Sequence, residues 1–194
     1  MRNEFLVLLT LASLASAPFA KADDGKEFVR SIGFGLNYNA LESESADATA
    51  AFGGMTYSAA LELPFYETTG FGLGLFSRFT ALDLRNGASN DQDEENLRGS
   101  DLTVGVLART GRFGLTVGGD YVLGRLDSRS GSVNSSESIS GFLPMVRLSY
   151  RIRPRNSKIY LEPCASYQTG RLTGTSKGYQ VRGTRIGLRT GIEF

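Results

Sequence analysis

The chain has 194 residues and a formal net charge of +1, with no histidine and a single cysteine, Cys164. The balanced charge gives no electrostatic reason to expect nucleic acid as a partner. The absence of histidine removes the commonest general base and the commonest transition-metal ligand, and one cysteine forms neither an internal disulfide nor a cysteine-based metal cluster. We therefore expect no metal site and no cofactor.

Residues 1–22 have the features of a cleaved secretory signal peptide. Arg2 gives a short charged start, residues 5–14 are apolar, and Ala20-Lys21-Ala22 forms a small-x-small cleavage site. An uncleaved membrane anchor is the alternative, but the apolar segment is short for a helical span of about 20 residues. We predict that residues 1–22 are removed and that residues 23–194 form one domain.

The rest of the chain alternates between apolar and polar residues in eight segments. The last shows the pattern most clearly, because Ile186, Leu188, Ile192 and Phe194 share one face with Thr190. Such alternation is typical of strands, whose side chains point to opposite faces, and each segment is near the ~9–11 residues that a tilted strand needs to cross a bilayer. The predicted strands are residues 30–38, 54–63, 71–82, 101–110, 113–125, 142–152, 159–169 and 184–194.

The connections between these segments alternate in length. Residues 64–70, 111–112 and 153–158 are short and contain turn formers, whereas residues 39–53, 85–100, 126–138 and 171–182 are longer and polar. Short periplasmic turns and longer extracellular loops are typical of outer-membrane barrels. The sequence therefore predicts an all-β fold, an eight-stranded antiparallel up-and-down transmembrane β-barrel.

A soluble lipocalin-like barrel is the main structural alternative, and the polar face argues against it. A lipocalin would place its apolar face inside and its charges in water, whereas in a membrane barrel the charges line the interior. The expected interior charges are five acids and six arginines: Glu62, Asp101, Asp120, Glu162, Glu193, Arg78, Arg109, Arg147, Arg151, Arg185 and Arg189.

These charges predict a closed interior. Eight strands enclose a space that side chains can fill, charges in a confined space must be paired or hydrated, and arginine pairs well with carboxylates. We expect a periplasmic and an upper layer of salt bridges that plug the barrel. A narrow charge-lined pore would favour an excess of one sign, and a hydrophobic-solute channel would need more apolar interior residues than Phe76, Leu107 and Val122.

The signal peptide, strand count, loop alternation and terminal Ile192-Glu193-Phe194 together resemble the small eight-stranded outer-membrane barrels, the group of the OmpA transmembrane domain and OmpX. The resemblance implies the outer membrane of a Gram-negative bacterium. It also implies that Leu188, Ile192 and Phe194 form the signal read by the barrel-assembly machinery. It does not fix the function, because members include adhesins, structural anchors, narrow pores and lipid-modifying enzymes.

Five arginines are expected at the extracellular rim, where they could contact lipopolysaccharide phosphates: Arg85, Arg98, Arg125, Arg171 and Arg182. The resemblance also bears on catalysis, because lipid-acting barrels of this size use a histidine with a serine. We expect a monomeric, non-enzymatic barrel that acts in envelope integrity or in binding a surface ligand through its extracellular loops. A small-solute or ion pore is the alternative, and a lipid-modifying enzyme is disfavoured.

Overall fold

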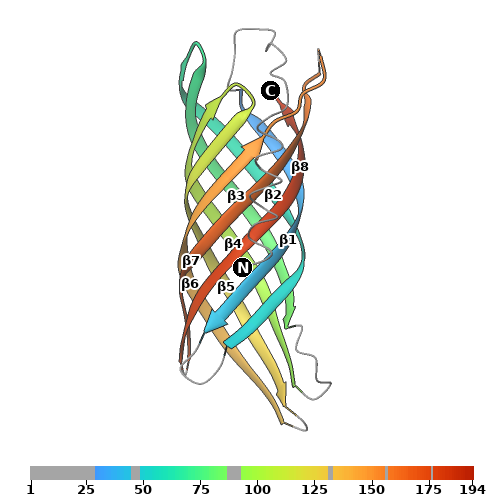
Figure 1. Ribbon diagram of the computed structural model, residues 1–194, viewed down its shortest axis with the longest axis vertical. Coiled ribbons are helices and arrows are strands. Elements are labelled where there is room, and N and C mark those ends of the chain that lie inside the picture. The colour runs from blue at the N-terminus through green and yellow to red at the C-terminus, as the bar shows by residue number, and fades with distance from the viewer. Residues whose placement is uncertain (1–28, 45–48, 87–92, 131–132, 156, 176) are drawn as a thin grey trace.

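The protein is a closed β-barrel. The computed structural model describes residues 29–44, 49–86, 93–130, 133–155, 157–175 and 177–194. Each strand pairs antiparallel with its neighbours in the sequence, and the first strand pairs with the last to close the ring (Figure 1). The strands are β1 (Ser31–Glu44), β2 (Thr49–Thr68), β3 (Phe71–Asn86), β4 (Asp93–Thr110), β5 (Phe113–Ser130), β6 (Val133–Tyr150), β7 (Ile159–Gly174) and β8 (Gly178–Glu193). The predicted fold class is confirmed. Within the described ranges, no helix is long and apolar enough to cross a membrane.

Tight turns occupy the end of the barrel that carries the C-terminus, at the top of Figure 1. Gly70 and Gly111 have φ angles of 94° and 53° in these turns, a conformation that glycine adopts without steric cost. The predicted connection at residues 64–70 is too long, because β2 continues to Thr68. The pairing of β2 with β3 shifts register between Pro64 and Tyr66, and such an irregularity is where a strand tolerates proline.

The predicted long loops at the opposite end are a larger error. Most of residues 39–53, 85–100, 126–138 and 171–182 belong to strands that extend well beyond the predicted ends. The hairpin of β5 and β6, for example, stays paired as far as Ser130 and Val133. The extracellular end is therefore a continuation of the barrel wall.

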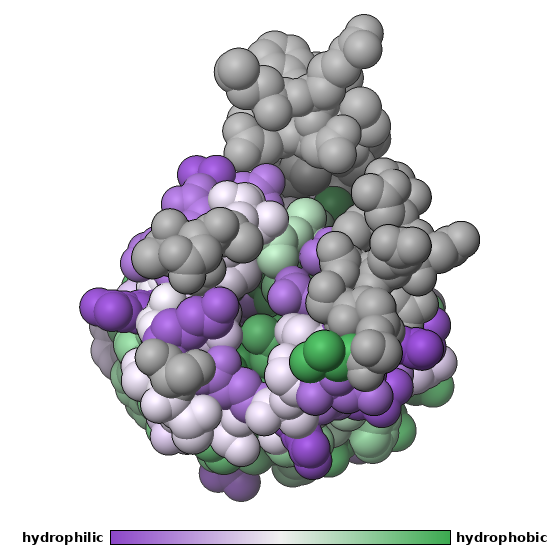
Figure 2. Space-filling view, turned by 90° about the horizontal axis from the view of Figure 1, so that it is seen from below, coloured by the Kyte–Doolittle hydropathy of each residue, from purple (hydrophilic) through white to green (hydrophobic). Residues whose placement is uncertain are grey.

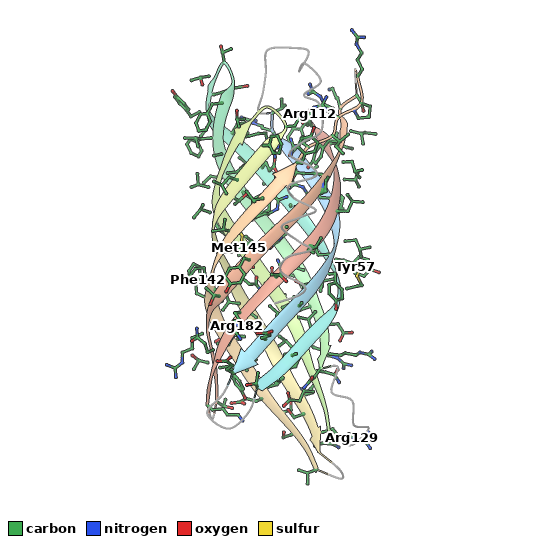
Figure 3. All side chains as sticks on the ribbon, viewed as in Figure 1. Tyr57, Arg112, Arg129, Phe142, Met145 and Arg182 are labelled. Carbon is green, nitrogen blue, oxygen red and sulfur yellow. The ribbon has the colours of Figure 1, made fainter. Side chains whose placement is uncertain are left out.

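An apolar band surrounds the part of the barrel nearer the turns. On β4, for example, Val104 is 54% exposed, and on β5 Val117 is 56% exposed. Tyr57 and Phe142 also point outward (Figure 3). A belt of exposed apolar side chains on a closed barrel is the surface that lipid covers.

Beyond this band the polarity of the wall is inverted. Leu84 is buried inside while its neighbour Arg85 points out, and Leu126 and Arg125 repeat the arrangement on β5. The outer face meets water here, so the charged residues are outside and the apolar ones inside. We call this water-facing part of the barrel, which includes Leu84, Arg85, Arg125 and Leu126, the extracellular storey. The part that carries the apolar band is called the membrane storey. The sequence alternates through both, but the face that is apolar changes.

Candidate functional site

The barrel interior holds the groups with the richest chemistry. All eleven charged residues predicted for the interior are buried. They lie in two layers, and apolar side chains form a third layer above them.

Two glutamates on different strands form the centre of the periplasmic layer. Glu62 on β2 and Glu162 on β7 both accept hydrogen bonds from Arg109 and Arg189. The Nη2 atom of Arg109 lies 3.0 Å from Glu162 Oε2 and 3.3 Å from Glu62 Oε2. Arg151 joins the same pair, with Nη2 at 2.6 Å from Glu62 Oε2 and Nε at 3.0 Å from Glu162 Oε2. These shared arginines tie four strands together across the interior.

Two further ion pairs extend this layer. Arg147 donates to Glu162 at 2.6 Å, and Arg151 donates to Glu193 at 2.9 Å. Arg153, which is partly exposed, reaches the other oxygen of Glu193 at 2.8 Å. The layer thus has four buried arginines and three buried glutamates, so its positive and negative charges nearly cancel.

Aromatic rings complete the periplasmic layer. The guanidinium carbon of Arg151 lies 3.9 Å from the centre of the Tyr160 ring, and that of Arg147 lies 4.7 Å from the centre of the Phe76 ring. Nε and Nη1 of Arg147 have no hydrogen-bond partner among the described residues, and the ring face offsets part of that cost. Tyr160 was missed by the sequence analysis. A Cβ at Gly191 would overlap its ring, so this glycine makes room for it.

The second layer lies nearer the extracellular side. Arg185 Nη2 is 2.6 Å from Asp101 Oδ2, and Arg78 Nη2 is 3.5 Å from Asp120 Oδ1. Thr103 donates a hydrogen bond to Asp120 and accepts one from Arg78. The layer has two arginines and two aspartates, so its net charge is zero, and all four side chains are buried.

The third layer is apolar and fills the extracellular storey. Its members come from all eight strands and form one buried cluster: Leu41, Phe52, Leu82, Leu84, Leu97, Val122, Leu126, Ile139, Leu143, Leu172, Tyr179 and Val181. The expectation that the interior is poor in apolar residues is therefore wrong. Leu41, Leu97, Leu126 and Leu172 lie in segments predicted as loops. Their inward direction follows only once the strands are known to continue.

A pocket of about 340 Å³ opens above the apolar layer. Figure 2, which looks into this end, shows a hollow with hydrophobic residues at its base and a polar surround. Its lining residues are Ser43, Ala50, Phe52, Glu95, Leu126, Ser128, Ser135, Ser136, Glu137, Thr175, Lys177 and Tyr179. The sequence analysis did not identify this pocket, because its walls come from six separate segments.

The five rim arginines all lie outside the barrel wall, beyond the apolar band. Arg98 is within 3.5 Å of Asp83, Arg125 is within 3.1 Å of Asp127, and Arg182 is within 2.7 Å of Glu42. Arg85 and Arg171 have no acidic partner within salt-bridge distance in the described part of the chain. Arg182 extends outward in Figure 3.

The remaining predicted residues lie at or near the periplasmic end. Leu188, Ile192 and Phe194 are exposed on the outer face of the last strand and the residue after it. Residues 1–22 lie outside the described residues. Among the residues that the structure does describe, no group of three or more His, Cys, Asp or Glu side chains is arranged to hold a metal ion.

Comparisons with known proteins show a likeness in fold. No protein-family model matches the chain, and no curated protein matches it. The crystal structure of Ail, the attachment invasion locus protein of Yersinia pestis, superimposes with a TM-score of 0.57 and 14% identity, covering 86% of this chain and 100% of Ail. The fold is that of the small outer-membrane β-barrels. A second Ail structure, in complex with the heparin analogue sucrose octasulfate, has a TM-score of 0.54 and 15% identity and covers the same shares of both chains.

Neisserial surface protein A is also similar, with a TM-score of 0.49 and 15% identity, covering 84% of this chain and 97% of that protein. The closed ring and its apolar band, together with this fold, place the barrel in the outer membrane of a Gram-negative bacterium. The predicted resemblance to the OmpA and OmpX group is confirmed at the level of fold.

Proposed function

We propose that this barrel is a non-enzymatic, non-conducting protein of the outer membrane that binds a ligand at the cell surface through its extracellular storey. The observation that carries the proposal is the filled interior. Two ion-paired layers and one apolar layer follow one another along the barrel axis, and the largest side chains within them are fully buried. An ion would have to pass all three.

The charge of the interior favours closure over conduction. An ion-selective pore needs an excess of one sign along its path, whereas the second layer is neutral and the periplasmic layer differs by one charge. The apolar layer adds a barrier of a different kind, because an ion loses its hydration shell there without gaining a polar partner. A channel for hydrophobic solutes is equally disfavoured, because such a solute would have to leave the apolar layer and cross the two ionic layers beneath it.

The interior also offers little for catalysis. Histidine is absent from the chain, so a general base would have to be a carboxylate. The interior carboxylates Asp120 and Glu162, for example, are each held in ion pairs with buried arginines. A carboxylate that is ion-paired and hydrogen-bonded is a poor proton acceptor, which supports a non-enzymatic role.

The extracellular storey offers a more suitable surface. Its strands project beyond the apolar band, and its outer arginines present the chemistry that phosphate and sulfate groups prefer. Ail, which shares this fold, has been crystallised with a sulfated heparin analogue. We extend the proposal to the rim: Arg85 and Arg171 contact lipopolysaccharide phosphates, while Arg98, Arg125 and Arg182 must first leave their acidic partners.

The outer face of the last strand has a separate proposed role. The side chains of Leu188, Ile192 and Phe194 are 48%, 52% and 61% exposed. This exposure leaves them available to the barrel-assembly machinery during insertion, as the resemblance to the OmpA and OmpX group implies. Once the barrel is inserted, the same side chains lie in the lipid-facing band.

Single-channel recording tests the non-conducting state. The protein is refolded, inserted into a planar bilayer and recorded over a range of voltages, with insertion verified by protease resistance of the strands. We expect a silent bilayer or rare, brief openings. A steady, ion-selective current in each successful insertion would overturn the proposal and favour the pore.

A further inference from the structure

The extracellular pocket has a chemical character that the three layers beneath it lack. Its base is apolar, formed by Ala50, Phe52, Leu126 and the ring of Tyr179. Its walls carry hydroxyl groups from β1, β5 and β6 and from the end of β7. A volume of about 340 Å³ lies within the range of small-molecule sites. The pocket is therefore shaped for one small ligand with an apolar body.

The charges in the pocket are unequal. Among the described residues, Glu95 and Glu137 line it together with one cation, Lys177. Glu137 Oε2 accepts a hydrogen bond of 2.6 Å from the Tyr179 hydroxyl, and Glu95 Oε1 accepts one of 3.2 Å from Ser128. Asn86 also donates to the other oxygen of Glu95, and Thr175 donates to the other oxygen of Glu137. These four donors are uncharged hydroxyl and amide groups. Each carboxylate oxygen can accept more than one hydrogen bond.

Tyr179 lines the pocket together with these two acids. Its pKa is raised by burial, by the hydrogen bond to Glu137 and by the negative charges of Glu137 and Glu95. The phenol therefore stays protonated and remains a donor to Glu137. Because Tyr179 lies above the apolar band and forms part of the pocket base, both negative charges act on the space where a ligand would rest.

The chain already places a cation in this pocket. The ammonium group of Lys177 lies 5.7 Å from the centre of the Tyr179 ring, a distance at which a cation and an aromatic face attract each other. Lys177 is exposed and lies just before β8, so its long side chain can leave without disturbing a strand.

We propose that the pocket binds a small organic cation, an amine whose apolar body rests on Phe52, Leu126 and Tyr179 and whose ammonium group faces Glu95 and Glu137. Lys177 competes with the ligand for this position. The inference deepens the proposed surface-binding role and rests on it. Conductance recording tests the closed interior, and amine binding tests the pocket. The proposed function and this inference can therefore fail independently.

The test is a calorimetric titration of the protein in nanodiscs with 2-phenylethylamine, against empty nanodiscs to subtract partition into lipid. The neutral analogue 2-phenylethanol tests the need for charge, and ethylamine tests the need for an apolar body. We expect saturable binding of 2-phenylethylamine at one site and at least tenfold weaker binding of each analogue. Equal binding of the neutral alcohol, or no saturable binding of the amine, would overturn the inference.

Two substitutions with opposite expected effects identify the site. Glu95→Gln removes a charge from a partly buried side chain and should weaken binding of the amine about tenfold, because the ammonium group loses a charge-assisted hydrogen bond. Lys177→Gln removes the competing cation and should tighten binding about two- to fivefold. Glu42→Gln, on the outer face, is the matched control and should change nothing. Unchanged affinity in the first two variants would also contradict the inference.

Discussion

Glu62 and Glu162 project into the barrel from β2 and β7 and share three arginines, Arg109, Arg151 and Arg189. Neither carboxylate belongs to a simple pair. Each arginine bridges both, so the unit consists of two acids held by three cations, from β4, from β8 and from the residue that follows β6. Removing either acid leaves several buried guanidinium groups without adequate compensation.

The first prediction concerns the stability that this unit provides. Glu162→Gln should lower the free energy of unfolding by about 3–5 kcal/mol, because breaking a buried ion pair leaves an uncompensated charge. Urea unfolding in lipid vesicles measures it. Glu42→Gln makes the same chemical change in the exposed pair with Arg182 and should cost about 1 kcal/mol or less. Equal losses in the two variants would show that the interior network contributes no special stability.

A second prediction concerns the number of barriers in the interior. Arg109→Ser with Arg189→Ser should lower the unfolding temperature but leave the bilayer silent, because the second ionic layer and the apolar layer remain. Single-channel recording of this variant checks it. A steady current from the double variant alone would mean that the periplasmic layer is the only effective barrier.

The apolar layer yields a third prediction. Leu84 and Leu143 are fully buried in the extracellular storey, and Leu→Ala at either should cost about 2–5 kcal/mol by removing core contacts. Vesicle unfolding again gives the value. Leu123→Ala, on the outer face of β5 where the side chain is 51% exposed, serves as the control with a smaller loss. If residues near Leu84 formed a loose loop, Leu84→Ala would cost almost nothing.

The change of polarity along the wall gives a fourth prediction. Val106 and Ser100 lie on the same outer face of β4, one in the apolar band and one toward the extracellular storey. Val106→Arg should cost about 2–4 kcal/mol and Ser100→Arg about 0–1 kcal/mol, following the depth dependence of charge on a lipid-facing surface. Similar costs at both positions would contradict the proposed position of the bilayer.

The strand number, closure and interior charges were predictable because the membrane storey has a simple rule. Lipid requires apolar residues outside, and the alternation then puts Arg109, Glu162 and their partners inside. The same rule fails beyond the band. There, Leu84 and Leu97 are inside and Arg85 and Arg98 are outside. A rule that places apolar residues on the lipid side therefore finds no membrane strand and predicts a loop.

Tyr160 and the pocket were missed for a different reason. Tyr160 occupies an interior position on β7. Its partners are Arg151, which follows β6, and Gly191 of β8, and only the fold brings them together. The pocket likewise combines Glu95 of β4 with Glu137 of β6 and Tyr179 of β8. The alternation within one segment carries no information about which residues of other strands lie beside it. The change of polarity along each strand, however, could have revealed the extracellular storey.

Thiol accessibility along the interior tests closure of the barrel layer by layer. In a Cys164→Ser background, single cysteines replace Ser128 at the pocket wall, Leu84 in the apolar layer and Thr116 deeper in the interior. A charged, membrane-impermeant thiol reagent is then added to the inserted protein. We predict rapid modification at 128 and protection at 84 and 116. Modification at 116 as fast as at 128 would mean that the interior is open to water, and the closed barrel proposed here would be wrong.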